Sequence, residues 1–268
     1  MNKLIAILTV LILTISTAGC ATVTFSNSPG SVLGKGNITR VSFPCGDFTR
    51  LAVQIPAELH YTAEKSDTVT IELYENLVEY LDVSNRRGEL TIRSTKNISL
   101  SAPANAGSTE LPKIYISAPV LEGLSAAGMF VTGSFDTITA DSFDLKVTGV
   151  VSGTFPVAVR ELSADMSGAG SVTLTGYADK VEIATSGAGS VNAYGLAAKE
   201  AYTEVTGIGS IELSCSEKLH ATISGLGGIS YMGDPVVTEN SSGLGRITRA
   251  NGKSGVPALP APPSPPLP

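Results

Sequence analysis

The sequence contains no tryptophan, and aromatic residues make up only 6% of its 268 residues. Charged residues are also scarce at 16%, whereas glycine is abundant, with 28 residues. A hydrophobic share of 43% is enough to build a core, but mostly from small and aliphatic side chains. This composition favours a thin, regular core over the core of a globular enzyme.

Positive charge is in short supply. The chain has 18 Lys and Arg against 24 Asp and Glu, for a net charge of −6. The net charge becomes −7, with 17 basic residues, if an N-terminal leader containing Lys3 is removed. An acidic chain of this kind is not expected to bind nucleic acid, or to bind a membrane surface through basic residues.

Residues that hold metals are few. The two histidines, His60 and His220, lie far apart, whereas zinc sites usually need three or four closely spaced ligands. We therefore expect no metal, no cofactor and no catalytic residue. Cys45 and Cys215 are also distant in sequence. They could form a disulfide in an exported protein, or remain as inward-facing free thiols, and the sequence leaves both possibilities open.

The N-terminal sequence predicts a targeting segment. Lys3 precedes an apolar run, Leu4 to Ile15, that is shorter than the about 20 residues of a membrane span. The run ends in Ser16-Thr17-Ala18-Gly19-Cys20, which resembles a bacterial lipoprotein signal and predicts a lipid anchor on Cys20. The alternative is an ordinary secretory leader cut near Ala18 or Ala21. We expect an outer-membrane lipoprotein, facing either the periplasm or the cell surface.

The rest of the chain divides by composition. A signal peptide over 1–20 is followed by a flexible tether over 21–37, rich in Ser and Gly. A domain over 38–249 consists of an N-terminal part, 38–120, and a Gly-rich part, 121–249. The tail, 250–268, is rich in Pro, which cannot donate to a strand ladder. The tail is interpreted as an extended terminator, with a Pro-rich recognition peptide as the alternative.

A short Ser-Gly-x-Gly phrase recurs through the second half of the chain. Its first glycine stands at 168, 187, 207, 225 and 243, and a degraded copy has Gly149. The steps are 19, 19, 20, 18 and 18 residues, a period that is typical of a solenoid. The glycines assigned to tight structural turns are Gly168, Gly170, Gly187, Gly189, Gly207, Gly209, Gly225, Gly227, Gly243 and Gly245. Glycine suits such corners because it accepts positive φ or a close backbone approach.

Alternating apolar residues flank each phrase and predict two short strands per unit. Stacking the units places Leu162, Val181, Ala201, Leu219 and Val237 in one inward column. A second inward column contains Val172, Val191, Ile211, Ile229 and Ile247. The predicted fold is all-β: a right-handed β-helix or β-solenoid of 18–20-residue coils. The N-terminal part is expected to cap its first coil, because an open coil exposes unpaired backbone groups.

The glycine-rich phrases do not match known ligand loops. No Lys follows them and a strand follows instead of a helix, which excludes a phosphate-binding loop and a dinucleotide fingerprint. Calcium-binding β-roll repeats need an Asp at the sixth position, where this chain has Val or Ile.

One outward stripe is a candidate binding patch. Aligning the repeats stacks Glu182, Tyr202 and His220 on neighbouring coils, with Asp165 and Glu204 expected beside them. The alternative interpretation is a solvated face of mixed charge. No Asp cluster and no nearby Arg or Lys is apparent from the sequence, which argues against a polysaccharide-cleaving site of the kind found on β-helical lyases.

The layout resembles the bacterial head GIN domain family. The matching segments are 43–48, 76–81, 90–92, 117–119 and 229–235, together with the ladder of Ser-Gly-x-Gly phrases. The resemblance covers roughly 38 to 249, although Thr148-Gly149-Val150-Val151 lacks the second glycine. It implies a β-helical, envelope-associated adhesin with no known catalytic residue. The leader indicates lipoprotein export rather than autotransport.

The sequence thus predicts a non-catalytic binding or structural module of the cell envelope. Its expected partners are the membrane, through Cys20, and a glycan or protein ligand of unknown identity. The first alternative is a periplasmic scaffold or stress-sensing partner, and the second is a glycan-active enzyme. Fold alone does not choose among them.

Overall fold

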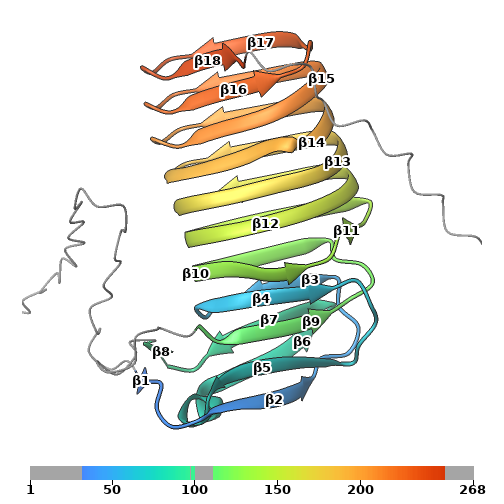
Figure 1. Cartoon of the computed structure of the whole chain (residues 1–268), viewed down its shortest axis with the longest axis vertical. Coiled ribbons are helices and arrows are strands. Elements are labelled where there is room, and N and C mark those ends of the chain that lie inside the picture. The colour runs from blue at the N-terminus through green and yellow to red at the C-terminus, as the bar shows by residue number, and fades with distance from the viewer. Residues whose placement is uncertain (1–31, 97, 100–110, 251–268) are drawn as a thin grey trace, which may run out of the picture.

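Figure 1 shows the computed structural model, in which residues 32–96, 98–99 and 111–250 are described. The predicted leader with Cys20, residues 21–31 of the predicted tether and residues 251–268 of the predicted tail lie outside this part. No helix within the described ranges is long and apolar enough to span a membrane.

The described chain winds into a β-solenoid of about 7 turns, which confirms the predicted fold class (Figure 1). Its Gly-rich strands are β10 (Gly123–Phe135), β11 (Ile138–Thr139), β12 (Ser142–Met166), β13 (Ala169–Thr185), β14 (Ala188–Val205), β15 (Ser210–Ile223), β16 (Gly228–Met232), β17 (Val236–Ser241) and β18 (Arg246–Arg249). All the pairings among these strands are parallel. The long strands bend at the corners, so each contributes to two faces of the solenoid.

The inward columns predicted from the repeats are those that the structure forms. Leu162 pairs with Val181, and the column continues through Ala201 and Leu219 to Val237. The second column likewise runs in register from Val172 to Ile247. Nearly all of these side chains are buried except in the last coil. The core is thin because each coil adds only a few aliphatic side chains.

The corner glycines stand directly above one another. A Cβ on Gly168 or Gly187 would lie 1.9 Å from the carbonyl oxygen of the corresponding glycine one coil below. The corresponding distances at Gly207, Gly225 and Gly243 are 2.1, 2.0 and 2.1 Å. Close approach between coils therefore requires glycine here, whereas Gly170 combines such an approach with a φ of +113°.

The N-terminal part closes the first end of the solenoid. Its elements are β1 (Val32–Leu33), β2 (Ile38–Pro44), β3 (Arg50–Val53), β4 (Ala57–Thr62), β5 (Thr68–Tyr74), the 3-10 helix η1 (Glu75–Tyr80), β6 (Leu81–Arg86), β7 (Glu89–Ser94), β8 (Ile98–Ser99) and β9 (Lys113–Ser117). Both β3 and β4 pair with β10, then β7 pairs with β3 and β9 with β4, all in parallel. Beyond them, β6, β5 and β2 pair antiparallel, and η1 buries Leu77.

Within the described ranges, the C-terminal end is not covered by further strands. It carries polar residues at inward positions of its last coil. Glu239 continues the inward column of Ala221, and Arg249 continues the column of Leu213 and Tyr231. Arg249 also pairs with Asp234 at 3.2 Å. Charges at inward positions of an edge strand oppose pairing with another chain.

Candidate functional site

The outward stripe predicted on one face of the solenoid forms in the structure. Glu182, Tyr202 and His220 are direct neighbours on β13, β14 and β15. The rings of Tyr202 and His220 stack with centroids 4.8 Å apart and planes inclined by 5°. This separation matches the spacing of adjacent parallel strands.

Two lysines border this stripe, and the sequence analysis did not predict them. The Lys180 ammonium lies 5.4 Å from the centroid of the Tyr202 ring, and Lys218 pairs with Glu200 at 2.6 Å. The expectation that no Lys lies nearby is therefore wrong. Lys180, Glu200 and Lys218 share one register position, two residues before the stripe, so extending the repeat alignment by two residues would have found them.

The ion pair between Glu200 and Lys218 shifts the pKa of both side chains. The hydrogen bond and charge of Lys218 lower the pKa of the Glu200 carboxyl. Reciprocally, the hydrogen bond and charge of Glu200 raise the pKa of the Lys218 ammonium. The border of the stripe therefore carries both signs of charge at neutral pH.

Asp165 and Glu204 do not lie together. They occupy the same register position, but Ala184 stands between them on the intervening coil. Glu204 lies two residues after Tyr202 on the same strand, so it borders the stripe. Asp165 lies on β12, the coil next to Glu182, but Ser163 is the residue paired with Glu182 there, so Asp165 is diagonal to the stripe. Both acids therefore border the stripe, Asp165 near Glu182 and Glu204 near Tyr202, but they are not neighbours of each other.

The stacking decides what the stripe can contact. One face of the Tyr202 ring is covered by His220, and Lys180 lies over the ring at cation–π distance. Tyr202 nevertheless remains 37% exposed, and His220 is half-buried. The stripe is thus arranged for polar and hydrogen-bonding contacts rather than for stacking a sugar ring.

A similar ladder lies near the N-terminal end. His60 stacks on Tyr115 with centroids 4.6 Å apart, and the Arg40 guanidinium lies 5.2 Å from the Tyr115 centroid. The backbone N–H of Ser134 donates to Nδ1 of His60 at 3.1 Å. These residues lie outside the repeats, so periodicity gave no signal for them.

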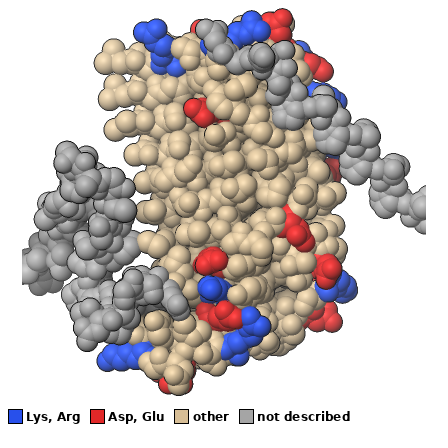
Figure 2. Space-filling model, viewed as in Figure 1, with Lys and Arg blue, Asp and Glu red and all other residues tan. Residues whose placement is uncertain are grey.

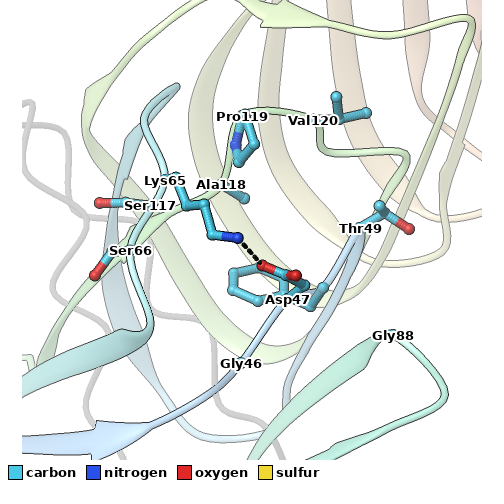
Figure 3. A pocket seen from close by; sticks show the side chains of 11 residues that line it. Gly46, Asp47, Thr49, Lys65, Ser66, Gly88, Ser117, Ala118, Pro119 and Val120 are labelled. Carbon is cyan, nitrogen blue, oxygen red and sulfur yellow. Dashed lines mark ion pairs between the residues drawn. The ribbon is translucent and has the colours of Figure 1, made fainter.

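A pocket of about 350 Å³ opens within the N-terminal part (Figure 3). The 46–49 and 117–120 segments form much of its wall, and the buried Phe48 is among the lining residues. Asp47 and Lys65 pair at 2.9 Å, and their side chains are 81% and 63% exposed. The pocket joins segments far apart in sequence, so the sequence did not reveal it.

The cysteines of the described chain are free and buried. Burial raises the pKa of the Cys45 thiol and of the Cys215 thiol. The free-thiol interpretation thus agrees with the structure and the disulfide does not. No cluster of three or more His, Cys, Asp or Glu in the described ranges could hold a metal ion.

Comparison with known proteins gives a family and a fold. The family described as "Putative auto-transporter adhesin, head GIN domain" matches residues 47–235. No curated protein matches. A crystal structure titled "putative adhesin" from Bacteroides fragilis has a TM-score of 0.72 and 21% identity, covering 82% of this chain and 100% of that one.

Two further solved structures share the fold. One, from Parabacteroides distasonis and titled "Putative lipid binding protein", has a TM-score of 0.58 and 20% identity, covering 82% of this chain and 100% of that one. The other, titled "putative adhesin" from Parabacteroides merdae, has a TM-score of 0.56 and 21% identity, covering 83% and 100%.

Proposed function

The chain belongs to the head GIN domain family, and we propose that it is an exported, surface-facing binding module of the cell envelope. The observation that carries this proposal is the in-register stripe of Glu182, Tyr202 and His220 on the solenoid face. A rigid scaffold that holds polar groups at fixed strand spacing loses little conformational entropy on binding. Such a surface suits a protein or glycan ligand that presents hydrogen-bonding groups.

Attachment through Cys20 is part of the proposal. It is supported by the apolar run from Leu4 to Ile15 and the Ala18-Gly19-Cys20 ending. A secretory leader cut near Ala18 or Ala21 would instead release the protein into the periplasm. Outer-membrane placement is proposed on the same evidence, because Ala21 rather than Asp follows the cysteine.

The test is a binding screen on immobilised glycans and envelope proteins with wild type, Tyr202→Ala and Tyr115→Ala. Tyr115 is a matched control, because it also stacks on a histidine but in the N-terminal part. We expect a wild-type ligand whose affinity falls at least tenfold in Tyr202→Ala and is unchanged in Tyr115→Ala. Equal affinity in all three proteins, each with a folded circular dichroism spectrum, would refute the stripe.

The glycan-active alternative has a specific observation behind it. Lys180 and Lys218 place basic groups next to Glu182 and Glu200, so the face does hold groups of both signs. We nevertheless propose a non-catalytic module, because Lys218 is engaged by Glu200 and Lys180 lies over the Tyr202 ring. Turnover on a glycan panel that is lost in Lys180→Met would overturn this choice.

The periplasmic scaffold remains the other alternative. It shares the fold and the leader with our proposal and differs in which side of the membrane the domain faces. Crosslinking in intact cells would recover periplasmic partners in that case.

A further inference from the structure

A ridge of apolar side chains runs along one corner of the solenoid. It occupies the variable position of the Ser-Gly-x-Gly phrase, and Figure 1 shows these corners stacked along the edge where β16 and β18 begin. Register aligns Met129 with Val150, then with Ala169 and Ala188. The ridge continues at the same phrase position through Ile208, Leu226 and Leu244. Every member is apolar.

The three members nearest the C-terminal end are large and exposed. Ile208 is 70% exposed, Leu226 61% and Leu244 88%, and Val150 further down the ridge is 42% exposed. They cannot turn inward, because the glycines on either side lie in backbone contact with the coil below. Three aliphatic side chains on successive coils therefore project in line, about 4.8 Å apart.

Two of the backbone N–H groups beneath this ridge are already hydrogen-bonded. The N–H of Ile208 donates to the carbonyl of Gly187, and the N–H of Leu226 to that of Gly207, both at 3.0 Å. These N–H groups would not be left unpaired in an apolar environment, where each would be costly. Ile208 and Leu226 can therefore leave water without that penalty.

Charge is nearly absent around the ridge. Within the corner phrases at 148–152, 167–171, 186–190, 206–210, 224–228 and 242–246, Arg246 is the one charged residue. Apart from Val151 and Arg246, the flanking positions are glycine, or Ser and Thr that are half-buried or exposed. Figure 2 shows that the middle coils on the face in view are also poor in charge, with charged side chains gathered toward the ends and one edge.

These properties decide what covers the ridge. Three aliphatic side chains present on the order of a few hundred Å² of apolar surface. A stable dimer needs about 800 Å² per partner, so the ridge is too small to hold a second copy. A lipid surface requires no matching shape, and it accepts apolar side chains below a border of hydroxyl groups.

We propose that Ile208, Leu226 and Leu244 form a membrane-docking edge that inserts into a neutral lipid surface. The straight ridge lies along the solenoid, so docking sets the solenoid axis parallel to the membrane plane. Few basic residues flank the ridge, so the attraction is hydrophobic and insensitive to salt. This inference goes beyond the proposed ligand binding at Tyr202, and it does not require a lipid on Cys20.

The absence of tryptophan makes a direct test possible. In the full chain carrying Cys20→Ser, Leu226→Trp places a single fluorophore on the ridge. Val236→Trp is the matched control: Val236 is 74% exposed but begins β17, at the far end of the strand that leads into the ridge corner. The probe is a vesicle of phosphatidylcholine with brominated acyl chains, which quench only tryptophan that enters the bilayer.

We expect the Leu226→Trp emission to shift to the blue and to be quenched at least twofold more than that of Val236→Trp. Equal quenching at both positions would overturn the proposal, because contact would not be specific to the ridge. A blue shift that appears without vesicles and grows with protein concentration would also overturn it, in favour of a second copy.

A second measurement does not depend on the tryptophan substitutions. In the Cys20→Ser chain, replacing Ile208, Leu226 and Leu244 together with serine should lower vesicle partition at least tenfold, with an unchanged circular dichroism spectrum. Partition of the Cys20→Ser chain with the ridge intact should change less than about twofold when salt is raised, because the Debye length governs only charge attraction. Partition that survives the serine substitutions, or that collapses with salt, would contradict the proposal.

Discussion

At the scale of single residues, glycine at the corners is a packing requirement more than a conformational one. The column from Gly168 to Gly243 lets each coil approach the one below until backbone meets backbone. A side chain at any of these positions would force the coils apart. The ladder hydrogen bonds on both adjoining faces would lengthen with them.

This predicts a sharp contrast between two glycines. Gly187→Ala places a Cβ 1.9 Å from the Gly168 carbonyl oxygen and should destabilise the protein by about 1–3 kcal/mol or more. Gly228→Ala, whose Cβ would lie 3.6 Å from the nearest atom, should be neutral or stabilise by about 0.4–1 kcal/mol. Urea unfolding of both variants measures the difference, and equal losses would contradict the stacking explanation.

The buried thiols give a second prediction. Burial of Cys45 and Cys215, with the raised pKa of each, keeps the reactive thiolate scarce. In a Cys20→Ala chain, a thiol reagent at pH 8 should react with neither cysteine until urea unfolds the protein, and then with both. Rapid reaction of the native chain would show that one thiol is accessible.

Residue positions within the repeats were largely predictable, and their surroundings were not. The fixed period places Tyr202 next to His220, because residues that align between repeats become direct neighbours when parallel strands pair in register. The ring stacking and the approach of Lys180 depend on side-chain torsions, which periodicity does not specify. The same register places Asp165 and Glu204 at one position, with Ala184 between them.

At the scale of elements, the two ends of the solenoid are protected by different means. Antiparallel β6, β5 and β2 cover the first coils, whereas the last coil carries Glu239 and Arg249 at inward positions. Apolar residues there would extend the core to an open edge and invite stacking of another molecule.

Glu239→Val with Arg249→Leu should therefore promote end-to-end association. The substituted last coil would continue the columns of Ala221 and Leu213 with apolar side chains. Analytical ultracentrifugation should show larger species that grow with concentration in the double variant and fewer of them in wild type. A matched pair of surface changes, Glu182→Val with Lys146→Leu, should not produce such species. Unchanged sedimentation of the end-coil variant would refute this role for the charges.

Ion pairs between successive coils predict how stability depends on pH. The pKa values of Asp141 and Asp179 are lowered chiefly by hydrogen bonds from Arg160 and Lys199, and that of Glu200 by Lys218. A lowered pKa in the folded state means that the stabilisation is complete above the unfolded pKa. It is lost as pH falls through the folded value. Melting temperature should thus be flat near neutral pH and fall in the acid range, below the ordinary values of 3.8 and 4.5.

The control is the triple variant Asp141→Asn, Asp179→Asn, Glu200→Gln. It should melt slightly lower at neutral pH and show a shallower fall in acid, because these exposed pairs contribute little each. Identical pH profiles for the variant and wild type would show that other groups govern acid unfolding.

The repeated elements could be read from the sequence, but the order of the N-terminal elements could not. Coils from β10 onward stack in chain order, so local periodicity suffices to place them. In the N-terminal part, β3 and β4 lie between β10 and the later strands β7 and β9. No period relates those segments, and the pocket that Asp47 and Lys65 border arises from this non-sequential stacking.

At the scale of the whole molecule, a rigid solenoid separates its surfaces. The Tyr202 stripe lies on one face, and the ridge of Ile208, Leu226 and Leu244 lies along a corner. A ridge seated on a membrane would leave the adjoining faces open to ligand. The two proposals are thus compatible, and each can fail without the other.

The orientation of the domain in the envelope is the most direct test of the central claim. A protease recognition site inserted within residues 21–31 gives one defined cleavage point, and its cleavage is followed in intact cells for wild type and Cys20→Ala. We predict that wild type is cut on intact cells and that Cys20→Ala is not retained there. Cleavage of wild type only after the envelope is opened would contradict a surface-facing binding module and favour the periplasmic scaffold.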